Sequence, residues 1–377
     1  MSPWNKRQLI ETIPATFPTE EFAVEGVQSL FYEGLDYRDR PTRVYAYYGV
    51  PQGPMPQGGW PGVVLVHGGG GTAFHEWVSI WNRRGYAALS MDIEGHLPDL
   101  ARAHDERPGH DGAGPCRTQI FGDCALPVAQ QWMYHAVADV VLAHSLMRSF
   151  PAVNAAKIGI TGISWGGIVT CCAMGLDDRF RFAIPVYGCG YLYEADTMMG
   201  KAFAGLAPEL RERAIRLWDP SAYINNAEMP TLWVNGQDAH FPLDSFMRSY
   251  DDARGPRFLR LQIGMAHSHQ AGWAEQEIYR FADSVVGDGV PLTAVAVPVK
   301  EDHEICAGYA SEAEIVQAEL CYTSDGGEWL QREWKSSEAT FDGVQVRADL
   351  PAGTAACFFN LTDSAGGLSS SPVHIPS

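Results

Sequence analysis

Six short, almost purely apolar runs limit most strongly what this chain can fold into. Each has the length of a strand, and stretches with helical periodicity separate them. The runs are GVVLVHG (62–68), GYAALSMDI (85–93), KIGITGIS (157–164), FRFAIPVYG (180–188), TLWVNG (231–236) and RFLRLQIG (257–264). Strands that are apolar on both faces are typical of a parallel sheet covered by helices on both sides. The alternation therefore predicts a doubly wound α/β domain with a mostly parallel sheet, whose reactive groups lie at the carboxyl ends of the strands.

The segments around these strands complete the domain. Residues 27–34 and 42–50 predict an antiparallel pair that opens the sheet. Helices are expected at 74–84, 131–150, 165–174 and 270–286. Two segments interrupt the alternation. Residues 95–128 form an excursion rich in Pro, Gly and Asp, of a length that is usually functional or mobile. Residues 191–226 contain a helical stretch that is a candidate for part of a lid.

The character of the chain changes after residue 286. Apolar and polar residues alternate, and SDGGE, PAGT and DSAGG mark turns between the alternating runs. We expect strands at 293–299, 316–323, 328–335, 344–350 and 355–362. The pattern predicts a small antiparallel β-sandwich of immunoglobulin or fibronectin type over residues 287–377, following an α/β domain over residues 1–286.

The balance of charge disfavours two classes of partner. The 377 residues include 27 Lys and Arg against 45 Asp and Glu, and the net charge of −18 repels nucleic acids and anionic membranes. The first twenty residues lack the apolar core of a signal peptide, and no run is long enough to span a membrane. We expect a soluble protein, cytoplasmic as written, with secretion or periplasmic export of a trimmed form left open. The sequence also leaves homo-oligomerisation open.

The eight cysteines show no metal-binding or disulfide framework. The absence of CxxC argues against a structural zinc site or a thioredoxin-type motif, and we expect no metal and no cofactor. Cys116 and Cys124 share a polar loop, and whether they form a disulfide is left open.

Ser164 stands in GISWGG, where a strand of this sheet is expected to turn into a helix. A serine in G-x-S-x-G at such a turn is the nucleophile-elbow pattern. The tight turn requires residues without side chains on either side, which Gly162 and Gly166 provide, and Gly167 lets the helix pack closely on the sheet. The pattern predicts that the hydroxyl of Ser164 is exposed above the sheet edge as a nucleophile.

A serine nucleophile needs a histidine base and usually an acid that orients it. Asp238 follows the strand at 231–236, and we prefer it to Asp244 because it lies closer to the strand end. His267 follows the last strand and is preferred as the base over His269, which falls at the start of the next helix and is expected to cap that helix or line the pocket. The order serine, acid, histidine is that of the α/β-hydrolases.

The oxyanion formed during attack on a carbonyl needs N–H donors. We expect one from the backbone of Trp165 and another from the Gly68–Gly69 region of the HGGGG loop. His67 is expected to be a structural hydrogen-bonding residue. Side chains near the strand ends are candidates to line the substrate pocket, with core packing as the alternative for each. They are Tyr187, Cys189, Phe241 and His269, together with Trp165 and Trp273.

These motifs resemble α/β-hydrolases of the acetyl xylan esterase, dienelactone hydrolase and prolyl-oligopeptidase-like group. The resemblance covers roughly residues 24–286 and rests on HGGGG, NAAKIGITGISWGG, DPSAYINNAEMPTLWVNGQDAHFPL and GMAHSHQAGW. Some members carry a β-sandwich after the hydrolase domain. The resemblance implies that Ser164 is the nucleophile, Asp238 the orienting acid and His267 the base. It implies the same oxyanion donors, Trp165 and the Gly68–Gly69 region.

The chain departs from the acetyl xylan and cephalosporin C deacetylases at two positions. Those enzymes usually have glutamine after the serine and an aromatic residue in the oxyanion loop, where this chain has Trp165 and Gly68. Specificity for sugar acetates is therefore open.

The hypothesis from sequence is a serine carboxylic ester hydrolase that acts through an acyl-enzyme on a small-molecule or carbohydrate ester. Two alternatives remain. One is a serine peptidase for short peptides, since the Trp165-Gly166-Gly167 elbow is closer to that of the peptidases. The other is a non-catalytic binding protein on a hydrolase frame. Trp329 and Trp334 of the sandwich either bind carbohydrate or pack against the larger domain.

Overall fold

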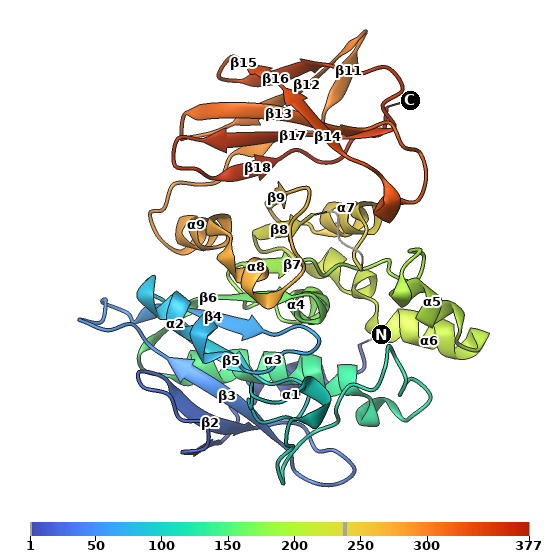
Figure 1. The fold of residues 1–377 in the computed structure, drawn as a ribbon. Coiled ribbons are helices and arrows are strands. Elements are labelled where there is room, and N and C mark those ends of the chain that lie inside the picture. Colours follow the sequence, from blue (N-terminus) through green and yellow to red (C-terminus); the bar gives the residue numbers. More distant parts are fainter. Residues whose placement is uncertain (1, 237–239, 377) are drawn as a thin grey trace.

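The larger part of the molecule is built on one nine-stranded sheet, in a computed structural model that describes residues 2–236 and 240–376 (Figure 1). The strand order is β1-β2-β3-β5-β4-β6-β7-β8-β9. The strands from β4 to β9 run parallel, whereas β1, β2 and β3 pair antiparallel with their neighbours. The strands are β1 (Thr16–Pro18), β2 (Gln28–Glu33), β3 (Arg43–Gly49), β4 (Trp60–Val66), β5 (Ala87–Met91), β6 (Val153–Ile163), β7 (Ala183–Val186), β8 (Thr231–Asn235) and β9 (Arg257–Leu261). The expected fold class and the opening antiparallel pair are confirmed.

Helices cover both faces of this sheet. On one face α2 lies beside α8 and α9, because the ring of Trp77 lies 5.4 Å from that of Trp273 and the ring of Trp81 lies 4.7 Å from that of Tyr279. On the other face α3 and α4 pack against each other (Figure 1). The helices are α1 (Lys6–Glu11), α2 (His75–Arg83), α3 (Trp132–Ser149), α4 (Trp165–Leu176), α5 (Met198–Ala204), α6 (Pro208–Trp218), α7 (Leu243–Asp252), α8 (His269–Ala274) and α9 (Gln276–Val286).

The register of the central strands brings three loops to one edge of the sheet. Val66 at the end of β4 pairs with Met91 at the end of β5 and with Gly162 near the end of β6. The loops that follow these strands therefore start side by side. They contain the glycines at 68–71, the start of the excursion and Ser164.

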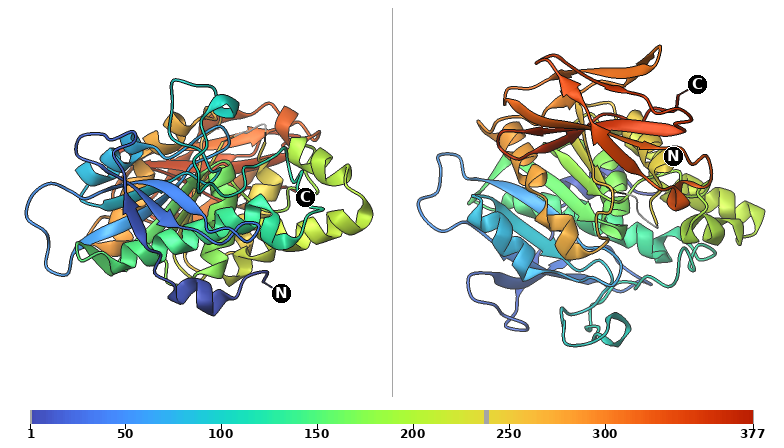
Figure 2. Two further views of the ribbon diagram at one scale, coloured as in Figure 1. Left: turned by 90° about the horizontal axis from the view of Figure 1, so that it is seen from below. Right: turned by 45° about the horizontal axis from the view of Figure 1, so that its top comes forward.

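The excursion over residues 95–128 runs along the outside of the domain, where it is teal in Figure 2. It contains one 3-10 helix, η1 (His104–Glu106). Backbone hydrogen bonds hold it to the sheet, since Arg43 N donates to Gly112 O at 2.7 Å. The indole of Trp132 donates to Ile93 O at 2.6 Å, just before the excursion begins. The excursion is thus anchored beside the carboxyl ends of the strands.

The C-terminal part is a sandwich of two antiparallel sheets with its own core. One sheet has the order β10-β12-β16-β15 with β11 paired to β12, and the other has the order β14-β13-β17-β18. Leu320, Val346 and Phe359 lie fully buried between the two sheets. The strands are β10 (Ala294–Val295), β11 (Val299–Glu301), β12 (Glu304–Ala310), β13 (Ile315–Thr323), β14 (Lys335–Glu338), β15 (Thr340–Phe341), β16 (Gln345–Asp349), β17 (Ala356–Asp363) and β18 (Leu368–Ser370).

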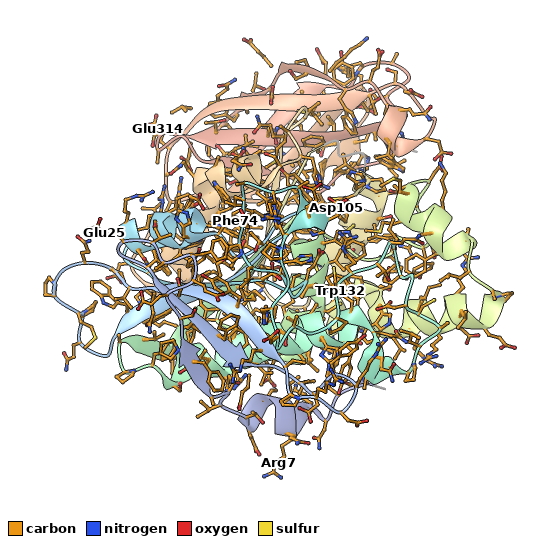
Figure 3. The ribbon with its side chains drawn as sticks, turned by 60° about the horizontal axis from the view of Figure 1, so that its bottom comes forward. Arg7, Glu25, Phe74, Asp105, Trp132 and Glu314 are labelled. Atoms are coloured by element: carbon orange, nitrogen blue, oxygen red, sulfur yellow. The ribbon has the colours of Figure 1, made fainter. Side chains whose placement is uncertain are left out.

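The sandwich packs on the edge of the large sheet at β9 and on α9. Leu261 of β9 donates its N–H to Ser370 Oγ at 2.8 Å, and its carbonyl accepts from Asn360 at 3.1 Å. Arg280 of α9 pairs with the buried carboxylate of Asp363 at 2.5 Å. Figure 3 shows Arg7 of α1 and Glu314 of the sandwich at opposite ends of the molecule.

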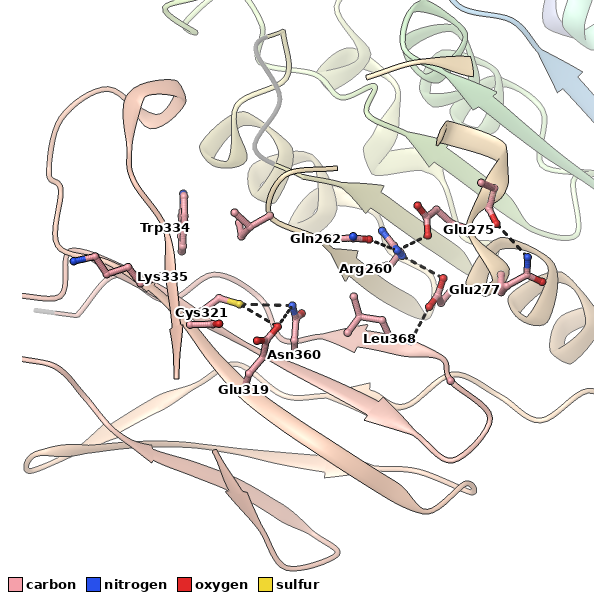
Figure 4. A pocket seen from close by; sticks show the side chains of 15 residues that line it. Arg260, Gln262, Glu275, Glu277, Glu319, Cys321, Trp334, Lys335, Asn360 and Leu368 are labelled. Carbon is pink, nitrogen blue, oxygen red and sulfur yellow. Dashed lines mark hydrogen bonds and ion pairs between the residues drawn. The ribbon is translucent and has the colours of Figure 1, made fainter. Parts of the chain in front are cut away.

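A cavity of about 550 Å³ lies at this interface (Figure 4). The buried guanidinium of Arg260 lies at one side and pairs with Glu275 and Glu277. Trp334 lines the opposite side, and its ring lies 5.3 Å from that of Phe358. Trp329 and Trp334 are partly buried and pack against an apolar cluster that runs from the larger part of the molecule into the sandwich. Carbohydrate binding by these side chains stays a prediction.

Two expectations for secondary structure were wrong. The helix expected at 270–286 is two helices, because Glu275 between them has extended backbone and its carboxylate binds Arg260. Residues 328–334 are not a strand but contain the 3-10 helix η5 (Trp329–Gln331), and strand β14 begins only at Lys335. Strand β12 was not anticipated. The remaining 3-10 helices are η2 (Val128–Gln130), η3 (Pro220–Ala222) and η4 (Ile224–Asn226).

Two further expectations from the sequence concern a disulfide in the excursion and membrane-spanning helices. Cys116 and Cys124 are free thiols, so the loop holds no disulfide between them. Within residues 2–236 and 240–376, we find no helix with the length and apolar character needed to cross a bilayer.

Candidate active site

Ser164 lies at a sharp turn between β6 and α4. Its backbone has φ 58° and ψ −116°, a conformation that residues with side chains rarely adopt. The turn depends on the flanking glycines, since a Cβ on Gly162 would lie 2.2 Å from Gly166 O and a Cβ on Gly166 would lie 2.1 Å from Val66 O. The side chain is half-buried and therefore reachable from solvent.

The imidazole of His267 faces this serine. Its Nε2 lies 3.0 Å from Ser164 Oγ, within hydrogen-bond distance. His267 is exposed on the loop between β9 and α8, so the pair is open to solvent. The sequence placed these two residues 103 positions apart, and the fold brings them together.

Tyr187 holds the His267 ring in place. The two rings stack at 4.5 Å with an interplanar angle of 26°, and the Tyr187 hydroxyl donates to Ala266 O at 2.6 Å. Tyr187 itself has φ +64°, at the end of β7. A strained residue that contacts a reactive imidazole is typical of a functional site.

Asp238, the acid favoured from sequence, lies outside the described residues. The residues that follow are close to the base, since the ring of His240 lies 5.1 Å and that of Phe241 lies 6.1 Å from the ring of His267. Asp244, the alternative acid, lies in the first turn of α7, where its Oδ1 accepts from Ser245 N at 2.8 Å.

The glycine loop after β4 corrects one expected oxyanion donor. Gly68 N donates to Nε2 of His269 at 2.9 Å, so this N–H is already engaged. Gly69 follows it, and Trp165 N lies in the first turn of α4, where a helix has no internal acceptor for its N–H groups. His67 is fully buried; its Nε2 accepts from Ile93 N at 3.0 Å and its Nδ1 lies 2.8 Å from Gly68 O. The expected structural role of His67 is confirmed.

His269 supports the glycine loop. Burial, together with the nearby His67, lowers the pKa of His269 to about 4, so at neutral pH its imidazole is neutral and can accept from Gly68. Its ring lies 4.8 Å from that of Phe74. His269 thus holds the glycine loop through Gly68, and its role in lining the substrate pocket stays a prediction.

The other expected pocket residues do not present a surface to a substrate. Tyr187 and Cys189 are completely buried, and Phe241 is 1% exposed. The rings of Tyr187 and Phe241 stack on the imidazole of His267. The burial of the three side chains favours the core-packing alternative.

Two arginines of the excursion contact this site, and sequence reasoning missed them. The Arg117 guanidinium lies 5.1 Å from the ring of Trp165, and a Cβ on Gly69 would lie 3.1 Å from its Nη2. Arg107 Nη1 donates to Gly71 O at 2.5 Å. The only signal in the sequence was that a long excursion begins at the carboxyl end of a central strand.

An apolar cavity of about 760 Å³ lies between the excursion and α5 and α6. It is next to the elbow, because the ring of Phe121, which lines it, lies 5.9 Å from the ring of Trp165. The other apolar side chains that line it come from both segments and are Ile120, Ala125, Met198, Ala202, Leu206 and Leu210. A lid role for α5 and α6 stays a prediction.

The sheet topology and the serine elbow define an α/β-hydrolase. Two family models match the chain: acetyl xylan esterase (AXE1) over residues 11–203, and the prolyl oligopeptidase family over residues 126–286. The first covers more than half of the 377 residues. The chain belongs to the acetyl xylan esterase family and is a hydrolase of the serine esterase type. The resemblance stated from the sequence motifs is confirmed.

Solved structures share this fold at low sequence identity. The acetyl xylan esterase from Paenibacillus sp. R4 is 21% identical, with 74% of this chain and 92% of that chain covered at a TM-score of 0.60. Acetyl xylan esterase 1 from Thermoanaerobacterium sp. JW/SL YS485 is 15% identical, with 74% and 91% covered at a TM-score of 0.58. A puromycin-hydrolyzing peptidase of Mycobacterium tuberculosis is 21% identical, with 71% and 41% covered at a TM-score of 0.50. A comparison with curated protein sequences finds no match.

Proposed function

We propose that the protein hydrolyses carboxylic esters through an acyl-enzyme on Ser164, with His267 as the base and Asp238 as the orienting acid. The observation that carries the proposal is the 3.0 Å separation between His267 Nε2 and Ser164 Oγ. It is supported by the strained elbow and by the solvent exposure of the pair. Asp238 is proposed from the chain order and from its place after β8.

The reaction proceeds in two steps. His267 Nε2 takes the proton of Ser164 as Oγ attacks the ester carbonyl, and then gives that proton to the leaving alcohol. Water, activated by the same imidazole, attacks the acyl-enzyme and releases the acid. The Tyr187 ring stacked on His267 keeps the imidazole in the plane that faces Ser164.

Backbone N–H groups of Trp165 and Gly69 stabilise the oxyanion. Gly68 gives up this role, because its N–H is bonded to His269. Each such donor contributes about 3 kcal/mol to transition-state stabilisation. Arg117, which packs on Gly69 and on the Trp165 ring, fixes the loop that carries one of the two donors.

The substrate class is an acetylated or otherwise short-acyl ester of a carbohydrate or another small alcohol. The family model and the two acetyl xylan esterase structures support it. The exposure of His267 also supports it, since a bulky alcohol can leave from an open site. Trp165 after the nucleophile distinguishes this chain from the deacetylases with glutamine there, so we expect its preference among sugar esters to differ from theirs.

Peptide hydrolysis is the second candidate, since the prolyl oligopeptidase model matches residues 126–286, which include Ser164 and His267.

We propose that the catalytic domain comprises residues 1–286 and that the sandwich comprises residues 287–377. The sandwich then acts as a packed support on β9, the strand that leads to His267.

One experiment separates these functions. Purified protein is assayed with p-nitrophenyl acetate, acetylated xylo-oligosaccharides, a feruloyl ester and an aminoacyl anilide, and is labelled with a fluorophosphonate probe. We expect ester turnover and labelling of the wild type, and loss of both in Ser164→Ala, with kcat lower by on the order of a millionfold. Ser336→Ala, an exposed serine of the sandwich, is the matched control. Faster turnover of the anilide would favour the peptidase, and absence of labelling in the wild type would favour a binding protein.

A further inference from the structure

Three side chains at the start of the excursion converge next to the active site. Glu94, His96 and His104 each offer one ligand atom, and these atoms all lie within 4.8 Å of one another. The two imidazole rings are perpendicular, with centroids 5.2 Å apart. Glu94 has a fully buried carboxylate, which contacts His104 Nε2 and accepts from Arg117 Nε at 2.9 Å.

A fourth group lies beside this cluster. Cys116 Sγ is 3.8 Å from His96 Nε2. A tetrahedral zinc ion with Zn–S and Zn–N bonds of ordinary length would hold a sulfur and a nitrogen about 3.6 Å apart. The observed separation is thus close to that of two ligands of one ion.

Two further observations on the geometry favour a bound cation. His96 Nδ1 is buried and has no hydrogen-bond partner among the described residues. The Glu94 carboxylate is held between His104 Nε2 and Arg117 Nε, which fixes its position in the cluster.

We propose that Glu94, His96, His104 and Cys116 form a binding site for a divalent transition-metal ion, with Zn²⁺ as its occupant. Two imidazoles, a carboxylate and a thiolate are a donor set that zinc prefers, whereas Mg²⁺ and Ca²⁺ require oxygen ligands. When Zn²⁺ binds, the Cys116 thiol gives its proton to the buffer and a Zn–S bond forms. His104 lies on the short helix η1, and its Nε2 already contacts the Glu94 carboxylate.

Such an ion would act on the site through Arg117. This side chain binds Glu94 on one side and lies over the ring of Trp165 on the other. A metal ion that binds the Glu94 carboxylate competes with Arg117 for it. Arg117 lies beside the proposed oxyanion loop, so its position there would change. This consequence rests on the proposed function, but metal binding itself does not.

A second group, His303, Glu304 and Asp349 of the sandwich, is the internal control. It has one imidazole and two carboxylates, and two of its three residues are exposed. Exposed acidic groups bind cations weakly, because the cost of fixing their side chains offsets the attraction.

The test is a titration of the full chain, stripped with EDTA and dialysed, with ZnCl₂ by calorimetry and with CoCl₂ by absorption spectroscopy. We expect one Zn²⁺ per chain, at least one proton released, and for Co²⁺ the visible bands of a tetrahedral site with a near-ultraviolet thiolate-to-cobalt band. His104→Ala should weaken Zn²⁺ binding at least a hundredfold, and Cys116→Ser should remove the thiolate band. His303→Ala and His75→Ala should bind as the wild type does.

Other results would overturn the site. They are a wild type that binds no Zn²⁺ above background, titrations of His104→Ala and Cys116→Ser that match the wild type, or a loss of binding in His303→Ala. Circular dichroism of each variant shows whether it is folded, and His104→Gln, which keeps the size of the side chain, replaces His104→Ala if that variant unfolds. Failure of esterase activity in the metal-free protein would bear on the proposed function and leave these binding results unchanged.

Discussion

The two histidines after β9 offer the sharpest prediction, because they are two residues apart and have opposite roles. His267 must accept a proton from Ser164, whereas His269 must stay neutral to accept from Gly68 N. We expect His267→Ala to lower kcat by on the order of a millionfold, as much as loss of the serine does. His269→Ala removes one positioning hydrogen bond of about 1 kcal/mol and loosens a loop whose donor contributes about 3 kcal/mol. We therefore expect His269→Ala to lower kcat/KM by between about tenfold and a hundredfold, mostly through kcat.

The pH dependence of stability gives a second readout for His269. Its pKa is lowered from 6.5 to about 4 by burial, so as pH falls the unfolded chain binds this proton first. Stability is therefore lost as pH falls through 6.5, and the loss levels off below about pH 4. At about pH 4.5 the linkage relation gives a loss on the order of 2 to 3 kcal/mol relative to pH 7.5 from this group alone. His269→Gln keeps an acceptor but has no proton to gain.

The assay is urea unfolding of the wild type and His269→Gln at both pH values, alongside ester kinetics of the two alanine variants. We expect the wild type to lose on the order of 2 to 3 kcal/mol more than His269→Gln between pH 7.5 and pH 4.5. Equal pH dependence in the two proteins would refute the argument that a buried, neutral His269 holds the loop. A larger kinetic loss in His269→Ala than in His267→Ala would show that the roles of the two imidazoles are reversed.

Three further changes test the elbow, the histidine support and the interface. Gly162→Ala should destabilise the fold by about 3 kcal/mol or more in urea unfolding, since its Cβ would lie 2.2 Å from Gly166 O, while Gly114→Ala, which meets nothing within 4 Å, should be neutral. Tyr187→Phe removes the hydrogen bond to Ala266 O but keeps the stacked ring, so kcat should fall about tenfold with KM unchanged; a fall in stability without a fall in kcat would contradict its positioning role. Arg280→Ala leaves the buried carboxylate of Asp363 without its cation and should cost about 3 kcal/mol, and an unchanged unfolding midpoint would show that the interface does not depend on this pair.

The sequence predicted the sheet and the elbow because both depend on local chemistry. Apolar runs between helical segments place the parallel strands, and a serine flanked by glycines can form the turn that the structure shows, where Cβ atoms would overlap backbone oxygens. The order of the candidate acid and base along the chain needed no coordinates either.

The sequence could not predict contacts between distant segments. Gly68 N reaches His269 across 201 positions, and this single bond removes Gly68 from the expected oxyanion donors. Arg117 reaches the elbow from an excursion without periodicity, and Glu275 breaks a helix to meet Arg260 of β9. In each case a polar group binds a partner from a distant part of the chain, and no local sequence pattern indicates that partner.

The loop between β9 and α8 links the proposed base to the proposed oxyanion loop. A Cβ on Gly68 would lie 3.1 Å from Ser164 Cβ, so the serine and the glycine loop are in contact. His267 from this loop and His269 from the first turn of α8 contact these two partners, and His269 is the more buried of the two imidazoles. Any movement of this loop shifts the base and the oxyanion loop together. Insertion of one glycine after Gly264 should therefore lower kcat at least as much as His267→Ala while the protein stays folded, and an insertion variant with near wild-type kcat would show that the two positions are independent.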